Sequence, residues 1–161
     1  MRRDKPKRAI DEIDRKILAA VQADGRITTQ ALAERVGLSA SPCARRLRLL
    51  EDAGIIKGYA AVIDPAKVGL AISAFASVKL ELQREEHLDR FAQAIADWPE
   101  VADCYLMTGR QDYLLRIVVP DLAAYERFLM HKLTRLKGVA SIETSFALGQ
   151  VKRSDALPEV P

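Results

Sequence analysis

Three arginines stand close together between residues 41 and 51, where they could bind a polyanion. At about 100° of rotation per residue, one side of a helix here would carry a hydroxyl group and three guanidinium groups. These side chains are Ser41, Arg45, Arg46 and Arg48, with Pro42 and Leu49 among them. Arginine can bond O6 and N7 of guanine with two hydrogen bonds in the major groove, or clamp phosphates. The pattern predicts a recognition helix that binds DNA.

The other side of the same segment is apolar. Ala44, Leu47 and Leu50 fall opposite the basic groups and can pack against two preceding helices. A basic helix face is also common on ordinary helical bundles, where it is simply solvated. The short helix–glycine–helix spacing and the apolar segment that follows favour a DNA-binding helix-turn-helix over that alternative.

Two helices are predicted ahead of the basic segment. The first has apolar residues at helical spacing up to Val21 and ends at Asp24-Gly25. The second is capped by Thr28 or Thr29 and ends at Gly37, a residue that tolerates a left-handed backbone. Both threonines would offer hydroxyl and backbone N–H donors to a phosphate.

The third helix and the segment after it complete the first predicted domain. Ser41 followed by Pro42 is typical of a helix start, and the helix is expected to run to about Asp52. Residues 55–63 resemble a strand pair or wing that is ended by Asp64-Pro65. We therefore predict a winged helix-turn-helix domain at residues 10–63. A basic arm at 1–9 precedes it and a linker at 64–70 follows it.

The second half of the chain changes from helical to alternating periodicity. Apolar and polar residues alternate from Ile72 to Leu82, which is typical of a strand. The later patterns predict a helix, two strands joined by a short turn, a second helix and a last strand at 139–151. The order β-α-β-β-α-β predicts a ferredoxin-like domain at residues 71–153, with a frayed tail at 154–161. The expected fold class is α+β.

Composition and charge are those of a globular protein with one basic half. The 161 residues are 49% hydrophobic and 29% charged, with a net charge of +3. Residues 1–63 carry +5 and residues 64–161 carry −2, so only the first half favours a polyanion. No run of about 18 apolar residues occurs, and the first residues lack the apolar core of a signal peptide. We expect a cytoplasmic protein that does not bind membranes.

The sequence gives little support for a metal site or a catalytic site. Cys43 and Cys104 lack the CxxC spacing of redox and zinc motifs, and His87 and His131 are far apart. There is no P-loop, no GxGxxG after a strand and no Ser/His/Asp arrangement. We expect no metal, no cofactor and no enzymatic activity. The competing hypothesis is a small enzyme on the ferredoxin-like half, because that fold hosts many chemistries.

Several stretches resemble the leucine-responsive regulatory protein/AsnC (Lrp/AsnC) family of transcription regulators. They are residues 10–18, 24–27, 32–39, 41–48, Glu51 and 54–56 in the first half, and Leu106, Gly109, 112–115 and Pro120-Asp121 in the second. The likeness covers residues 10–153. It implies a DNA-binding winged helix-turn-helix, to whose contacts Ser39 is added, and a C-terminal RAM-type domain that binds amino acids and drives oligomerisation. Arg45 and Leu49 depart from the family pattern, so the DNA target does not transfer.

The resemblance implies an effector pocket, between dimers, at the turn that joins the two middle strands. Asp112 could accept a hydrogen bond from the ammonium group of an amino acid, and N–H groups freed by Gly109 could bind its carboxylate. On local evidence alone, these residues favour an ordinary hairpin turn. The predicted effector residues are Leu106, Thr108, Gly109, Arg110, Asp112 and Tyr113, with Leu122, Phe146, Ala147 and Gln150 as further walls.

Self-association follows from the predicted ferredoxin-like sheet, which has one face without helices. We expect Phe75 and other apolar side chains on that face, and two such faces would pair into a homodimer with two recognition helices. The resemblance implies further assembly into an octamer. The expected function is a nucleoid-associated, sequence-specific transcriptional regulator that responds to an amino acid. The alternative is an architectural DNA-binding protein that ignores ligands.

Overall fold

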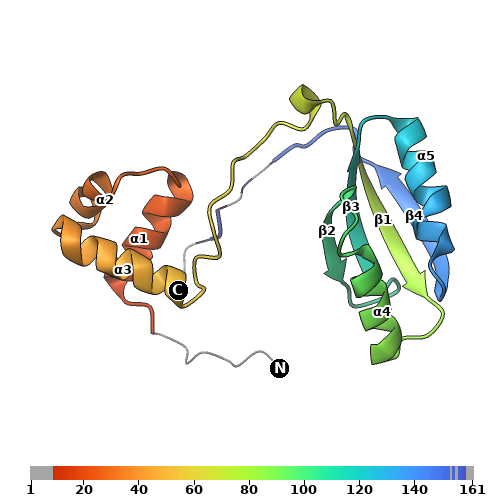
Figure 1. Cartoon of the computed structure of the whole chain (residues 1–161), viewed down its shortest axis with the longest axis horizontal. Helices are drawn as coiled ribbons and strands as arrows, with labels where there is room; N and C mark the ends of the chain where they lie inside the picture. Colours follow the sequence, from red (N-terminus) through yellow and green to blue (C-terminus); the bar gives the residue numbers. More distant parts are fainter. Residues whose placement is uncertain (1–8, 153, 155, 159–161) are drawn as a thin grey trace. The chain divides into compact units, whose positions relative to one another are not determined.

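The computed structural model describes residues 9–152, 154 and 156–158, and the chain divides into two compact units (Figure 1). The first unit runs to Val62 and includes the described residues from Lys152 onward, and the second is Ile63–Val151. Residues 1–8 of the predicted basic arm lie outside the described residues, as do 153, 155 and 159–161 near the predicted frayed tail. Residues 64–70, predicted as a linker, contain a 3₁₀ helix at Ala66–Val68.

The first unit is a three-helix fold built from α1 (Glu12–Ala23), α2 (Thr29–Val36) and α3 (Ala40–Asp52). Its core contains fully buried side chains from all three helices, among them Ile17, Leu32 and Leu50. The threonine cap predicted for α2 is present, since the Thr28 side chain accepts a hydrogen bond from the Ala31 N–H at 3.2 Å. The predicted end of α3 at Asp52 is also confirmed.

The turn between α2 and α3 depends on Gly37. This residue adopts a left-handed conformation with φ of 75°, which glycine reaches without the steric penalty of a side chain. The predicted start of α3 at Ser41-Pro42 was wrong by two residues, because Ser39 is the N-cap and Ala40 begins the helix. Pro42 still lies in the first turn, where no backbone N–H is needed by the helix.

The predicted wing strands are not present. Within the described part of the chain, residues 55–71 contain no strand. Ile55 and Ile56 instead close the core, and their N–H groups donate to the Leu50 carbonyl at 3.0 and 3.2 Å. A strand needs a neighbouring strand for its backbone hydrogen bonds, and within one chain this segment does not have one.

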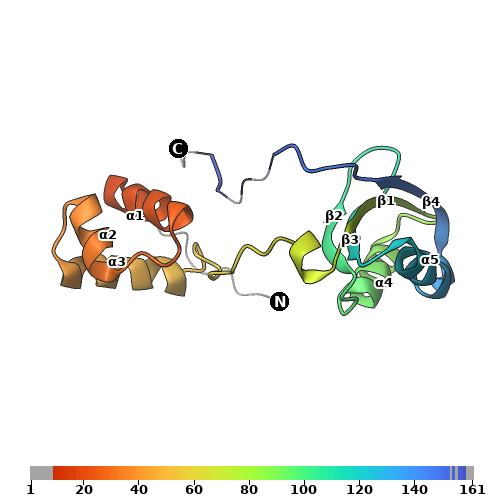
Figure 2. The same cartoon turned by 90° about the horizontal axis from the view of Figure 1, so that it is seen from above.

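The second unit confirms the predicted β-α-β-β-α-β order. Its elements are β1 (Ile72–Leu80), α4 (Glu85–Ile95), β2 (Val101–Leu106), β3 (Tyr113–Val119), α5 (Leu122–His131), a 3₁₀ helix at Leu133–Arg135 and β4 (Val139–Phe146). The strands pair antiparallel in the order β2-β3-β1-β4. Figure 2 shows α4 and α5 on the same face of the sheet.

The core of the second unit lies between this sheet and its two helices. Alternate residues of β3, from Tyr113 to Val119, are buried there together with those of β1, from Ala74 to Leu80. Phe91 and Phe128 contribute aromatic rings from α4 and α5. The period-2 pattern of the sequence therefore corresponds to one packed face and one uncovered face.

The uncovered face of the sheet is more polar than predicted. Alternation places Phe75, which is 38% exposed, and Leu114 on this face, but also serines and charged residues from every strand. Arg116 of β3 donates to the Asp103 carboxylate of β2 at 2.5 Å. The face is mixed, with apolar side chains beside an ion pair. Separately, among the described residues no helix combines the length and the apolar character that crossing a membrane requires.

Candidate nucleic-acid interface and effector residues

The outward face of α3 presents a hydroxyl group and two guanidinium groups. Ser41, Arg45 and Arg48 are exposed, and they line a shallow cavity of about 320 Å³ together with Ala44, Leu49 and Asp52. Their spacing of three and four residues places them on one helix face. Ser39 is exposed at the N-cap of this helix and its side chain makes no capping hydrogen bond. Thr28 and Thr29 are exposed at the start of α2.

Arg46 does not lie on that face, so the prediction that it projects outward with Arg45 and Arg48 was wrong. Its Nη1 atom donates to the Asp11 carboxylate at 2.5 Å and to the Asp14 carboxylate at 3.1 Å. The core-facing side of α3 includes the predicted Leu50 and Leu47 but also Cys43, which the prediction left out. The buried side is therefore rotated from the predicted one, and Arg46 lies at its edge and turns toward α1. Its side chain is 29% exposed, whereas the Asp14 side chain is 1% exposed.

The two acidic partners of Arg46 are residues that sequence reasoning missed. Asp11 and Asp14 form a reciprocal capping box at the start of α1, in which each side chain accepts from the other residue's N–H. The Arg46 hydrogen bond is the main cause that lowers the pKa of the Asp11 carboxyl from its ordinary value. The D-x-x-D spacing was visible in the sequence, but its partner lies 35 residues away from Asp11.

The connection between β2 and β3 forms an exposed loop. Leu106, Met107, Thr108 and Arg110 are exposed, and Gly109 has φ of 110°. The loop is closed by the Met107 N–H, which donates to the Asp112 carbonyl at 2.8 Å. The turn that the sequence indicated is therefore present, and its exposed residues are accessible to a ligand.

Asp112 does not offer its carboxylate to that loop. It is 6% exposed, and its side chain accepts hydrogen bonds from the Leu80 N–H at 2.7 Å, from Gln83 Nε2 at 2.7 Å and from Lys79 Nζ at 3.4 Å. The predicted role as acceptor for a ligand ammonium group is contradicted by this burial. The carboxylate instead holds the end of β1 against the start of β3.

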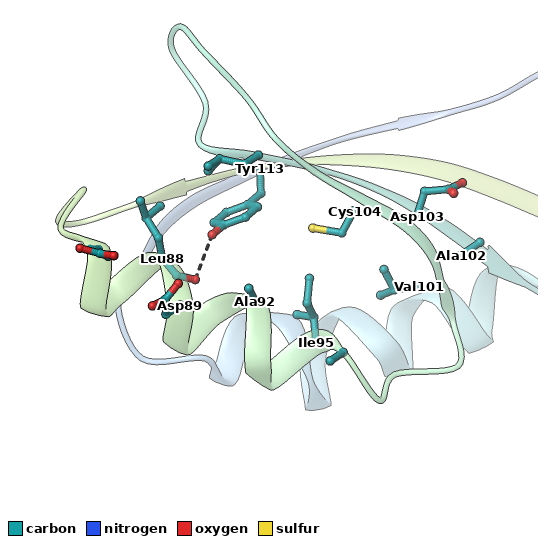
Figure 3. A pocket seen from close by; sticks show the side chains of 12 residues that line it. Leu88, Asp89, Ala92, Ile95, Val101, Ala102, Asp103, Cys104 and Tyr113 are labelled. Carbon is teal, nitrogen blue, oxygen red and sulfur yellow. Dashed lines mark hydrogen bonds between the residues drawn. The ribbon is translucent and has the colours of Figure 1, made fainter. Parts of the chain in front are cut away.

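Tyr113 is also turned away from the loop. Its ring stacks on Phe91 of α4 with 4.5 Å between the ring centroids. Figure 3 shows the ring pointing from β3 toward α4, where its hydroxyl donates to the Leu88 carbonyl at 2.9 Å. Burial is the largest cause that raises the pKa of its hydroxyl. Strand alternation sends Tyr113 to the helix side of the sheet, so its side chain is a core residue rather than a wall of the predicted pocket.

The remaining predicted effector residues lie at the other end of the sheet. Phe146 pairs with Ala74 near the start of β1, whereas Tyr113 pairs with Val78 near its end. Ala147 donates its N–H to the Ser73 carbonyl at 2.9 Å, and Leu122 begins α5 directly after β3 ends. Gln150 is exposed beyond β4. A single chain therefore does not bring these four residues together with the β2–β3 loop.

A groove that sequence reasoning missed runs between α4 and the edge strand β2. It has a volume of about 680 Å³ and is lined by apolar side chains of α4, including Leu88 and Ile95, and by Cys104 and Tyr113 of the sheet (Figure 3). Glu85 and Asp89 of α4 also line it, as does Asp103 of β2, whose carboxylate is paired with Arg116 on the other face of the sheet. The described residues contain no cluster of histidine, cysteine or acidic side chains able to hold a metal ion.

Comparison with known families assigns both units. Residues 10–57 match the winged helix-turn-helix DNA-binding family, and residues 73–157 match the Lrp/AsnC ligand binding domain. The chain is 48% identical to the Bkd operon transcriptional regulator of Pseudomonas aeruginosa, over 92% of this chain and 97% of that protein. It is 43% identical to the leucine-responsive regulatory protein of Rhizobium meliloti, over 89% of this chain and 92% of that protein.

Solved structures agree with this assignment. A transcriptional regulator from Neisseria meningitidis in complex with L-Met has a TM-score of 0.87 and 41% identity, covering 93% of this chain and 97% of its own. An AsnC family transcriptional regulator from Agrobacterium tumefaciens has a TM-score of 0.85 and 38% identity, covering 92% of this chain and 96% of its own. The chain belongs to the Lrp/AsnC family of transcriptional regulators, with a DNA-binding domain and a ligand-binding domain.

Proposed function

We propose that the protein binds operator DNA through the outward face of α3 and that an amino acid modulates this binding. The exposed guanidinium groups of Arg45 and Arg48, one helical turn apart on α3, carry the DNA half of the proposal. Ser39, Ser41 and Pro42 extend the contact toward the start of α3, and Thr28 and Thr29 offer donors to the DNA backbone from α2. Such binding would place the protein in the cytoplasm with the nucleoid.

The operator contact is tested with Arg45→Ala and Arg48→Ala in the full chain. The probe is the duplex that the parent protein enriches from a random-sequence pool. We expect each change to weaken binding by about 1–3 kcal/mol, because each removes a direct contact to a base or a phosphate. Binding of the parent should also weaken steeply with salt, since lysine and arginine contacts release counterions. Parent-like binding by both variants would contradict this assignment of the DNA-binding face.

The effector half of the proposal is supported by family membership and by the exposed β2–β3 loop. A relative of known structure was solved in complex with L-Met, and the loop residues Thr108, Gly109 and Arg110 supply backbone N–H groups and one guanidinium to an amino-acid carboxylate. Leu106 and Met107 offer exposed apolar surface for a side chain. Because Leu122, Phe146, Ala147 and Gln150 lie at the other end of the sheet, they could share a site with this loop only through a second copy of the chain.

In this proposal, effector binding is coupled to DNA binding through the assembly of dimers. A ligand that contacts two dimers at once favours the state in which they touch, by the difference in its affinity for the two states. We propose a homodimer that assembles further, up to an octamer, and in which the effector repositions the recognition helices. Calorimetry against the twenty amino acids, with light scattering in parallel, tests this. Heat from one class of amino acid with a change in mass supports it, whereas no heat and no change would favour a ligand-independent architectural protein.

A further inference from the structure

Arg46 is the basic residue of α3 that is held by the protein itself. In each carboxylate of the α1 capping box, one oxygen accepts a backbone N–H and the other accepts from Arg46. In Asp11, Oδ1 accepts the Asp14 N–H and Oδ2 accepts from Arg46. In Asp14, Oδ2 accepts the Asp11 N–H and Oδ1 accepts from Arg46. The guanidinium therefore joins the first turn of α1 to the middle of α3. Arg46 thus contacts both carboxylates of the capping box.

Burial makes this connection difficult to exchange for another. The Asp14 side chain is 1% exposed, and a buried carboxylate without a charged partner is strongly unfavourable. If Arg46 turned outward to a phosphate or a base, it would give up its charge-assisted hydrogen bonds to Asp11 and to the buried carboxylate of Asp14. Arg45 and Arg48 on the exposed face are free of such a cost, since no ion pair from either residue is found among the described residues.

We propose that Arg46 is a positioning residue, which sets the orientation of α3 relative to α1 so that Arg45 and Arg48 reach the bases. This inference rests on the proposed DNA-binding function. A positioning role is distinguished from a purely electrostatic one by whether removing the charge of Asp11 weakens or strengthens DNA binding. Asp11 is an acidic group near a predicted DNA-binding surface, so removing its charge should strengthen DNA binding if the residue acts only through electrostatics. If Asp11 helps to orient α3, removing its charge should weaken specific binding.

The test uses four variants of the full chain: Asp11→Asn, Arg46→Gln, the double variant, and Glu12→Gln as control. Asparagine caps a helix about as well as aspartate, so Asp11→Asn removes the charged contact while α1 keeps its cap. Glu12→Gln is the matched control because it removes a negative charge from the adjacent, exposed position, where Glu12 pairs with Lys16 of the same helix. Affinities are measured for the selected duplex and for a random duplex over a range of salt concentrations. Stoichiometric titration gives the active fraction of each variant, and circular dichroism confirms its fold.

We expect Asp11→Asn and Arg46→Gln to lower the ratio of specific to random-duplex affinity by about threefold or more, because misoriented base contacts are lost while phosphate contacts remain. The double variant should lose no more than Arg46→Gln alone, since both changes remove the same contact. Glu12→Gln should keep the parental ratio and bind equally well or more tightly. A role in global stability alone would lower the melting temperature without changing the ratio.

Besides a lower melting temperature with an unchanged affinity ratio, two outcomes would overturn the inference. In the first, Asp11→Asn behaves like Glu12→Gln. In the second, Arg46→Gln weakens binding to both duplexes equally and lowers the salt slope by about 1, which is the signature of a lost phosphate contact. Failure of the proposed function is recognised separately, by parent-like binding of Arg45→Ala and Arg48→Ala.

Discussion

At the scale of the residue, Asp112 shows how one carboxylate can stabilise a junction between strands. It lies just before β3, yet its side chain accepts the N–H of Leu80 at the end of β1 and the amide of Gln83 in the following loop. Its own N–H donates to the Val78 carbonyl at 2.9 Å. These bonds fix the end of the sheet from which the β2–β3 loop extends.

Replacing Asp112 with alanine should therefore destabilise the second unit. The change leaves the buried Leu80 N–H without its acceptor and removes a charge-assisted bond, for an expected loss of about 3 kcal/mol in free energy of unfolding. Denaturant titration followed by Trp98 fluorescence measures this, because the single tryptophan packs against Phe128 in the same unit. Asp89→Ala, at an exposed site on α4, is the control and should stay within about 0.5 kcal/mol of the parent. Equal stability of Asp112→Ala and the parent would contradict this role.

At the scale of the element, the turn at Gly37 determines how α3 follows α2. The Gly37 N–H donates to carbonyls of Ala33 and Glu34, and the Leu38 N–H donates to the Ala33 carbonyl at 2.9 Å. These hydrogen bonds satisfy carbonyl groups at the end of α2, and the chain changes direction within two residues. The exposed basic face of α3 depends on this reversal.

Gly37→Ala should lower stability by about 1–2 kcal/mol, the cost of a left-handed conformation for a residue with a Cβ atom. A Cβ at this position meets no atom within 4 Å, so the effect should come from the backbone alone. Thermal unfolding monitored by circular dichroism measures it. Gly25→Ala is the control, since Gly25 does not need the left-handed region and its Cβ would make an ordinary 3.4 Å contact with Tyr59. Similar melting temperatures for the two variants would show that the turn tolerates a side chain.

At the scale of the whole molecule, the uncovered sheet face is the surface on which the proposed dimer depends. Phe75 lies near its centre on β1, paired with Arg116 of β3 and Ser145 of β4. Its mixed composition is consistent with an interface that combines an apolar centre with polar surroundings.

Phe75→Glu should weaken the dimer, because burying a carboxylate at the interface costs its hydration and the neighbouring Arg116 is already paired with Asp103. We expect the dissociation constant to rise at least about tenfold, which corresponds to 1.4 kcal/mol. Sedimentation equilibrium measures the change. Met130→Glu is the control, since it replaces another exposed apolar residue on α5 and should leave the dimer intact. If only Met130→Glu dissociates the dimer, the helix side of the unit forms the interface instead.

The sequence by itself determined the identity and order of the elements, because the signals for them are local. The 3.6-residue and two-residue periodicities, the cap at Thr28 and the glycine at 37 each act within one or two turns of chain. The predicted wing strands show the limit of such local signals. The segment after α3 has the apolar character of a strand, but a strand also requires a partner, and no local pattern can supply one.

Only the tertiary structure decided the roles of the charged and aromatic site residues. Arg46 meets Asp11 across 35 positions and Asp112 meets Leu80 across 32, so a helical wheel or a turn motif cannot show that either side chain is engaged. Tyr113 was predicted to bind the effector from the start of its strand, but the packing of α4 against the sheet makes it a core residue. A buried polar side chain forms hydrogen bonds with the groups that the fold places next to it. Which side chains are buried, and beside which groups, depends on the folded chain as a whole.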